Sequence, residues 1–376
     1  DGSRPPLMTL FQDPARQVNL VFGVVPYGRA SSGTDFQASD NAWFGEIRSD
    51  FDPAVILEGG ETLESDPAWI AYGLMDTDHL DHYYSLSLVD LPRQPQGWDC
   101  PRAWVTVEEE AGLTELVRRA QQGKEFGVNM ALVPASWEGR PGSMRGASPR
   151  YPGNMADAAR ALQQAGSVPG LTIDPLLTQG GSERWAAQSS DGQTWLDLSS
   201  DEAKEAARKR IRSALGWGFK FLVVPPSNIP DEVLIHFRMT RQQADMMALV
   251  VTAEAAGAIP VLPSSAMSLT AVRDLWLKAA GTASRMAEHR VFPAPLRLDL
   301  TGLTELDQET STAIRLWPGP IEVVGAPGAR GRDGLAQCFR LPRLMGRQIE
   351  SVTQEARLWQ MKFHGPAQAY YGAAVL

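Results

Sequence analysis

The sequence lacks long hydrophobic runs and has no excess of basic residues. No apolar run approaches the roughly 18 residues that a membrane-spanning helix needs, so we expect no membrane span. The net charge of −9 and the pI near 5.2 argue against a nucleic-acid partner, whose phosphates require a basic surface. Internal repeats and low-complexity segments are also missing, which argues against a solenoid.

Cysteine is scarce, with only Cys100 and Cys338 in 376 residues. Two buried thiols are the simpler interpretation, because cysteine packs well as a small apolar side chain. A disulfide is the alternative, and it would suit an extracytoplasmic protein. The first six residues contain neither an initiator Met nor the apolar core of a signal peptide, so we expect a processed or trimmed product.

The composition is that of an ordinary soluble globular protein, with 43% hydrophobic and 21% charged residues. A chain of this length suffices for one large domain with appendages or for two domains. Residues 1–92 are predicted to be β-rich, because short β-branched or alternating runs at 18–25, 54–57 and 84–89 are separated by Gly, Pro and Asp. We expect a small antiparallel sheet or a half-sandwich there.

A polar run at 76–82 gathers three carboxylates and two imidazoles, which are ligands that hard or borderline cations use. The run lacks the Gly and the terminal Glu of a calcium-binding helix–loop–helix. A solvated loop is therefore the favoured interpretation, and we expect neither a metal nor a cofactor.

From about residue 95 the pattern changes to alternating strands and helices. The clearest unit has a strand at 170–175, a helix that begins near Ser199 and ends at Gly216, and a strand at 219–224. Ser199 and Glu202 have the spacing of a capping box. Strand, helix and strand in this order predict a crossover connection between parallel strands.

Eight such strands are predicted, which favours a (β/α)8 TIM barrel over residues 93–340. The expected strands are 96–100, 128–133, 170–175, 219–224, 258–262, 266–271, 296–300 and 321–325. Helices are expected around 113–120, 154–166, 199–216, 244–251 and 275–287. Residues 341–376 return to a β-rich pattern, with a hairpin formed by 356–363 and 367–376. Cys100 and Cys338 follow strands one and eight, which are neighbours in a closed barrel, so the disulfide stays open as an alternative.

Several motifs in this region occur in the order found in one enzyme family. They are Gly97-Trp98 with Trp104, Trp137 shortly after the second strand, Pro152-Gly153-Asn154-Met155, Pro169-Gly170-Leu171 with Pro175, and Leu196-Asp197-Leu198-Ser199. Over about residues 95–330 the chain resembles the α-galactosidase and raffinose-synthase type of retaining glycoside hydrolases. The resemblance implies the barrel fold and a carbohydrate ligand.

The catalytic positions of that family are not matched. The family's fourth strand ends in Lys-x-Asp, whose Asp is the nucleophile, and these places fall on Val223 and Pro225 here. The Asp pair that holds sugar hydroxyls after the second strand is replaced by Pro134 and Ala135. Near the sixth strand the nearest carboxylate to the acid/base position is Asp274, inside an expected helix. A glycosidase needs two carboxyl groups flanking the scissile bond, so the family's chemistry is predicted to be lost.

Three carboxylates and three tryptophans remain near the predicted mouth of the barrel. Asp99, Asp174 and Asp299 are placed at the carboxyl ends of strands, where the active sites of such barrels lie. Trp98, Trp137 and Trp185 are predicted to lie in loops at the same mouth, where aromatic faces suit the apolar faces of sugars. Structural roles for these six residues are the alternative: turn caps, ion-pair partners and core packing.

The leading hypothesis is a catalytically degenerate glycoside-hydrolase-like protein that binds carbohydrate, or serves a structural role, in an extracytoplasmic setting. The first alternative is an active, α-galactosidase-like hydrolase in which Asp174 and Asp299 act as relocated catalytic acids. The second is a protein-interaction module whose barrel merely carries the β-rich ends.

Overall fold

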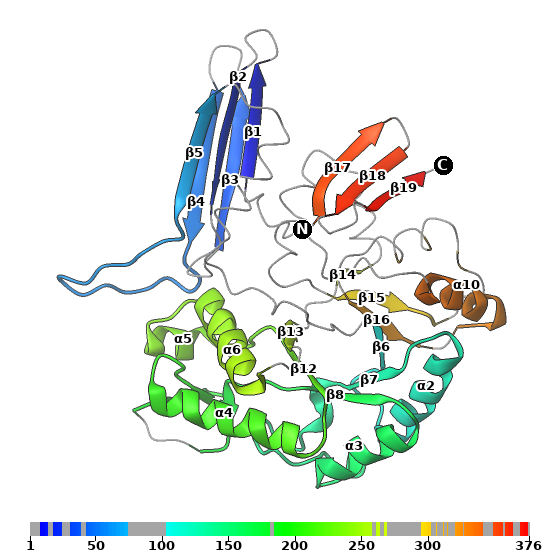
Figure 1. Cartoon of the computed structure of the whole chain (residues 1–376). Helices are drawn as coiled ribbons and strands as arrows, with labels where there is room; N and C mark the ends of the chain where they lie inside the picture. Colours follow the sequence, from blue (N-terminus) through cyan, green and yellow to red (C-terminus); the bar gives the residue numbers. More distant parts are fainter. Residues whose placement is uncertain are drawn as a thin grey trace.

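The computed structural model describes residues 8–13, 18–24, 31–38, 43–73, 103–180, 184–257, 261–263, 267–268, 295–301, 306, 311, 314, 320–325, 327–340, 349–355, 358–363 and 369–374. A curled parallel sheet and its helices make up one side of the molecule (Figure 1). The N-terminal and C-terminal antiparallel strands both lie beyond the other side of that sheet. The architecture is α/β, with β-rich segments at both ends of the chain.

The N-terminal strands confirm the β-rich prediction for this region. Strands β1 (Met8–Asp13), β2 (Val18–Val24) and β5 (Ala68–Gly73) form an antiparallel sheet in the order β1-β2-β5, and β3 (Ser31–Ala38) pairs with β4 (Trp43–Asp50). The strand predicted at 54–57 is wrong, because these residues lie in an irregular excursion between β4 and β5. Ile56 and Leu57 remain 71% and 48% exposed there. The runs at 76–82 and 84–89 lie outside the described residues.

The central sheet has the strand order β13-β12-β8-β7-β6-β16-β15-β14, and all its strand pairs are parallel. The strands are β6 (Ala103–Thr106), β7 (Met130–Val133), β8 (Val168–Thr172), β12 (Phe221–Val224), β13 (Val261–Pro263), β14 (Met267–Ser268), β15 (Leu296–Asp299) and β16 (Ile321–Val324). Among the described residues the first strand of this sheet is β6, and the strand expected at 96–100 lies outside them.

The two edges of this sheet, β13 and β14, are not paired with each other among the residues that the structure describes. The described part of the chain therefore shows a curled parallel sheet, and a closed (β/α)8 barrel is not established. Three residues separate β13 from β14. So short a connection leaves no room for the crossover helix that normally joins parallel neighbours.

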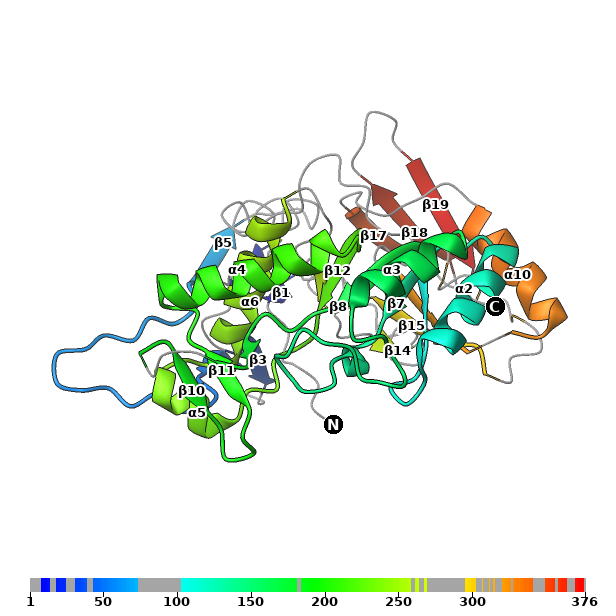
Figure 2. The same ribbon diagram turned by 90° about the horizontal axis from the view of Figure 1, so that it is seen from below.

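Helices cover the outer face of the sheet, as the view from below shows (Figure 2). They are α2 (Leu113–Glu125), α3 (Met155–Gln164), α4 (Asp201–Gly216), α6 (Arg241–Ala256) and α10 (Ala329–Arg340), while the short helix α5 (Asp231–Phe237) lies beside the strand at 186–188. Their apolar positions recur at helical spacing and are buried against the strands, as Leu116 and Ala120 show on α2. The helix expected at 275–287 lies outside the described residues, and α5 and α10 were not predicted.

The inner face of the sheet, on which no described helix packs, has a small apolar cluster of its own. Trp104, Leu132, Phe221 and Val223 pack there from β6, β7 and β12. Gly170 on β8 leaves room for the Phe221 ring, because a Cβ at Gly170 would lie 2.2 Å from that ring. Side chains alternate along a strand, so every second residue of these strands points to the same inner face.

An antiparallel insertion interrupts the predicted strand–helix–strand unit. Strands β9 (Leu177–Thr178), β10 (Ala186–Gln188) and β11 (Thr194–Leu196) form a three-stranded sheet between β8 and α4. The predicted cap of α4 is also wrong by one residue. The N-cap is Ser200, whose hydroxyl accepts the Ala203 N–H at 3.2 Å, whereas the Ser199 hydroxyl donates to Asp197 at 2.6 Å.

The C-terminal hairpin prediction is confirmed. Strand β18 (Leu358–Phe363) pairs antiparallel with β19 (Ala369–Ala374). A further strand, β17 (Ile349–Glu355), pairs with the other edge of β18 and completes a three-stranded sheet.

The revised helix cap predicts different outcomes for two neighbouring serines. Ser200→Ala removes the acceptor of the Ala203 N–H and should lower the free energy of unfolding by about 1 kcal/mol. Ser199→Ala should change it by less than about 0.5 kcal/mol, because Ser199 is exposed and caps no helix. Urea denaturation of both variants measures the difference, and equal or reversed losses would contradict the assignment of Ser200.

Candidate functional site

The carboxyl ends of the parallel strands meet at one edge of the sheet, where the active sites of α/β folds lie. Acidic residues follow or end three of these strands. They are Glu108 and Glu109 after β6, Asp174 after β8, and Asp299 as the last residue of β15. The ends of β7 and β12 are followed by Pro134-Ala135 and Pro225-Pro226, which offer no ionisable group.

Asp174 lies two residues beyond β8 and is half-buried. Its Oδ1 accepts the backbone N–H of Leu176 at 2.9 Å, which closes a tight turn around Pro175. Burial raises the pKa of Asp174 to about 6, and the charges of Glu138 and Asp245 act in the same direction. The Leu176 N–H and Arg210 oppose this shift. Asp174 is thus a carboxyl group that titrates near neutral pH.

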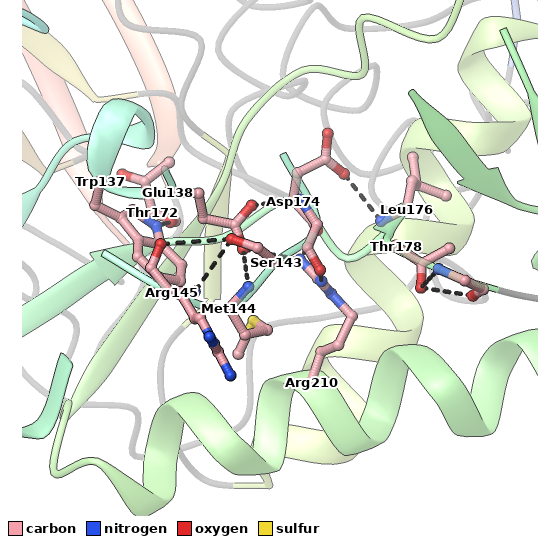
Figure 3. A network of polar contacts seen from close by, with 12 residues as sticks. Trp137, Glu138, Ser143, Met144, Arg145, Thr172, Asp174, Leu176, Thr178 and Arg210 are labelled. Atoms are coloured by element: carbon pink, nitrogen blue, oxygen red, sulfur yellow. Dashed lines mark hydrogen bonds and ion pairs between the residues drawn. The ribbon is translucent and has the colours of Figure 1, made fainter. Parts of the chain in front are cut away.

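A buried ion pair lies beneath Asp174 and holds two loops together (Figure 3). The Arg210 guanidinium, which α4 supplies, lies 3.5 Å from Glu138 and donates to the Gly142 carbonyl at 2.6 Å and to the Asp174 carbonyl at 3.4 Å. Glu138 also accepts the N–H groups of Gly142 and Met144 at 2.7 and 2.9 Å. The Asp174 carboxylate itself points away from Arg210, toward Leu176.

Asp299 is exposed at the end of β15, and its Oδ1 accepts the Thr301 N–H at 2.8 Å. Hydrogen bonds from Thr301 lower the pKa of this carboxyl group. Strands β8 and β15 are four positions apart in the sheet, which is about 19 Å measured along the sheet. The structure therefore places Asp174 and Asp299 at the same edge of the curled sheet, on strands four positions apart.

A second charged group, which sequence reasoning missed, lies on the inner face of β6, β15 and β16. Arg297 and Glu322 are register partners, and their side chains lie 3.3 Å apart. Arg297 also lies 3.2 Å from Glu108, and the Trp104 indole N–H donates to Glu322 at 3.4 Å. Burial raises the pKa of Glu322, while the Arg297 charge and the Trp104 hydrogen bond oppose that shift.

A signal for this group was present in the sequence. Arg297 and Asp299 alternate with buried leucines in β15, which marks a strand with one polar face. Glu108 was overlooked because the first strand was expected at 96–100, so that Glu108 did not stand at a strand end.

The tryptophans predicted as sugar platforms occupy different environments. Trp137 is only 1% exposed, its indole N–H donates to the Thr172 carbonyl at 2.7 Å, and its ring meets Trp217 edge-on. The structure therefore corrects the expectation of an exposed ring at Trp137. Trp185 is half-buried and keeps part of its surface accessible. Trp98 and Asp99 lie outside the described residues.

Other expectations concern metals, cysteines and membranes. Within the described ranges, no group of three or more His, Cys, Asp or Glu side chains is arranged to hold a metal ion. Likewise, no helix among the described residues is long and apolar enough to cross a bilayer. Cys338 is buried on α10, with its thiol 3.9 Å from the Ser311 carbonyl. Cys100 lies outside the described residues, so neither the favoured interpretation of two buried thiols nor the alternative of a Cys100–Cys338 disulfide is tested.

Comparison with known proteins identifies the fold. No family model matches the chain, and no curated protein matches its sequence. The structure is similar to TtGalA, an α-galactosidase from Thermus thermophilus solved with p-nitrophenyl α-D-galactopyranoside, at a TM-score of 0.57 and 16% identity over 94% of this chain and 78% of that one. It is also similar to the GH36 α-galactosidase AgaB from Geobacillus stearothermophilus, at a TM-score of 0.58 and 12% identity over 93% of this chain.

An α-galactosidase from Lactobacillus brevis gives a TM-score of 0.57 at 11% identity, over 97% of this chain. The chain spans 57% of the Geobacillus protein and 60% of the Lactobacillus protein. The protein thus has the fold of α-galactosidases, a glycoside-hydrolase fold. Identities this low show the fold alone and leave the activity to be argued from the site.

The raised pKa of Asp174 predicts a pH-dependent stability difference. The unfolded carboxyl group has a pKa near 3.9, so the folded protein holds an extra proton between about pH 4 and 6 and loses stability as the pH rises through that window. Asp174→Asn keeps an oxygen acceptor for Leu176 but cannot ionise. Its stability relative to wild type should therefore rise by about 1–3 kcal/mol between pH 4 and 7.

Asp299→Asn is the matched control, because the pKa of Asp299 is lowered and the sign is reversed. Its stability relative to wild type should fall as the pH rises from about 2 to 5 and change little between pH 5 and 7, because the stabilisation from the lowered pKa is gained only around and below the unfolded pKa near 3.9. Denaturant unfolding at several pH values tests both variants, and parallel pH profiles for the two would contradict the pKa assignments.

The Glu138–Arg210 pair predicts a large stability loss. Glu138→Ala leaves the Arg210 charge buried without its carboxylate and removes the acceptor of two N–H groups, so it should cost about 3–5 kcal/mol. Glu254→Ala removes a partner of Arg208 in a more exposed pair and should cost at most about 1 kcal/mol. Thermal and urea denaturation measure the loss in free energy of unfolding for both variants. Equal losses would contradict the prediction that burial makes the Glu138–Arg210 pair the more important one for stability.

Proposed function

We propose that this protein binds a carbohydrate at the carboxyl edge of its parallel sheet and does not hydrolyse it. The observation that carries the proposal is the end of β12. This strand ends at Val224 and continues into Pro225 and Pro226, at the place where the resembling family has its nucleophilic Asp. Proline offers neither a carboxylate nor an N–H, so it can neither attack a sugar nor stabilise an attacking group.

The remaining acids at this edge have structural tasks that support the same conclusion. One oxygen of Asp174 and one of Asp299 each accept the N–H two residues further along and close a turn. A retaining glycosidase requires two carboxyl groups about 5 Å apart and an inverting one about 6.5–9.5 Å apart. Asp174 and Asp299 lie on strands four positions apart, and each carboxylate is oriented by the turn that it closes. Neither turn orients its carboxylate toward the other acid.

A second candidate function is hydrolysis by these same relocated acids. The observation that favours it is the opposite direction of their pKa shifts, because the pKa of Asp174 is raised to about 6 and that of Asp299 is lowered. A protonated acid beside an ionised carboxylate is the arrangement that glycosidases use. In this case Asp174 would protonate the leaving oxygen and Asp299 would act as nucleophile or base.

The proposal includes closure of the sheet into a barrel, which gives the site a mouth. Strand β13 pairs with β12 and strand β14 pairs with β15, so the two edge strands are close neighbours in the sequence. The Cα atoms of Pro263 and Met267 are four residues apart and thus separated by at most about 14 Å. This bound supports a ring in which one continuous segment joins the two edges.

The function is tested by measuring binding and turnover on the same protein. Methyl α-D-galactopyranoside binding, followed by calorimetry and by saturation-transfer NMR, should be detectable. Release of p-nitrophenol from p-nitrophenyl α-D-galactopyranoside should not exceed that of buffer, with an active α-galactosidase as positive control. Turnover that Asp174→Asn and Asp299→Asn both abolish would instead establish the second candidate. Absence of binding to this and a panel of other neutral glycosides would contradict the carbohydrate proposal.

A further inference from the structure

The inner face of the sheet is divided into an apolar part and a charged part. On β6, β7 and β12 it carries the packed cluster of Trp104, Leu132, Phe221 and Val223. On β15 and β16 it carries Arg297 and Glu322, which stand beside Trp104 in the same register of three adjacent strands. The Glu322 side chain is 11% exposed, whereas that of Arg297 is 42% exposed. The pair therefore reaches from the interior toward solvent.

Stability alone does not explain this pair. The pair is partly exposed through Arg297, and such ion pairs contribute only about 0–1 kcal/mol, so apolar side chains packed in their place could stabilise the fold as well. The apolar cluster next to it shows that the inner face of this sheet accommodates such packing. A charged pair kept in that position is expected where a polar ligand is recognised.

The contacts orient the guanidinium in a defined way. Nη1 of Arg297 is held by Glu322, while Nη2 faces Glu108 at 3.2 and 3.3 Å. Glu108 is 60% exposed and follows β6 at the carboxyl edge of the sheet. The donors of Arg297 and the acceptors of Glu108 therefore lie side by side and in contact with each other. Adjacent sugar hydroxyls would complement this arrangement, because each hydroxyl both donates and accepts a hydrogen bond.

The charges around Arg297 also select the ligand. Asp299 lies two residues further along β15 and so points to the same face, and Glu108 and Glu322 both contact the guanidinium. Two carboxylates therefore contact the guanidinium, and a third lies two residues away on the same face of β15. A ligand that carries its own carboxylate would meet net repulsion here, while a neutral sugar would not.

We propose that Arg297, held by Glu322 and paired with Glu108, is a specificity-determining residue that binds adjacent hydroxyl groups of an uncharged sugar and rejects sugar acids. This inference rests on the proposed function and adds the ligand class and the residues that select it. Both Arg297 and Glu108 contact the ligand directly, and Glu322 acts as a positioning residue through Arg297.

The test compares two methyl glycosides by calorimetry at pH 7. One is methyl α-D-galactopyranoside, and the other is methyl α-D-galactopyranosiduronate, which carries a free 6-carboxylate. Wild type should bind the neutral sugar at least about tenfold more tightly. Glu108→Gln should weaken neutral-sugar binding about tenfold, because it removes a charged hydrogen-bond acceptor. It should also lower the ratio of the dissociation constant of the sugar acid to that of the neutral sugar by about two- to fivefold, because one repelling charge is removed.

Glu125→Gln is the matched control, because Glu125 forms a similarly exposed pair with Arg332 between α2 and α10. It should leave both affinities unchanged. Arg297→Lys keeps the positive charge but loses the planar guanidinium, so neutral-sugar affinity should fall about tenfold while the unfolding midpoint stays near that of wild type.

Equal or tighter binding of the sugar acid by wild type would overturn the inference. A selectivity ratio that Glu108→Gln leaves at the wild-type value would also overturn it. So would an Arg297→Lys variant with lower stability and unchanged affinity, which is the result of a purely structural role. If neither sugar nor the wider panel of glycosides bound to wild type, the proposed function itself would fail, and that outcome is distinguishable from a loss of selectivity.

Discussion

Parallel pairing of the strands is the constraint on which the rest of this structure depends. Because β6, β7, β8, β12, β15 and β16 run in one direction, their carboxyl ends lie at one edge, and residues distant in sequence become neighbours. The pairing places Trp104, Arg297 and Glu322 side by side on three strands. Helices shield the outer face, so buried aliphatic residues dominate the sheet and polar residues concentrate on its inner face and at its edge.

Two charged groups occupy this framework in different ways. The Glu138–Arg210 pair is buried. Glu138 accepts hydrogen bonds from the backbone of the loop that contains Gly142 and Met144, and Arg210 donates to the same loop and to the turn after β8. The pair therefore stabilises that loop and that turn. The Arg297–Glu322 pair lies on the inner face and opens toward solvent through Glu108. The Glu138–Arg210 pair is buried and holds the fold together, whereas Arg297 and Glu108 keep part of their surface exposed to solvent.

The fold of this protein does not by itself fix its chemistry. The similarity to α-galactosidases extends over more than nine-tenths of the chain, at identities of 11–16% for the three proteins compared above. At the end of β12, however, stands Pro225, and the acids elsewhere at the edge are tied into turns or ion pairs. A barrel-like scaffold supports many functions by changing the residues at strand ends, so a binding role is compatible with the fold without requiring hydrolysis.

The sequence by itself determined the α/β region, the position of most of its strands and helices, the β-rich ends and the resemblance to α-galactosidases. These follow from hydrophobic periodicity and from Gly, Pro and capping residues, which act within a few positions along the chain. Only the tertiary structure decided that Trp137 is buried, that Ser200 rather than Ser199 caps α4, and that Arg297 and Glu322 meet on the inner face. Strand register brings together residues far apart in sequence, and no local pattern specifies that register.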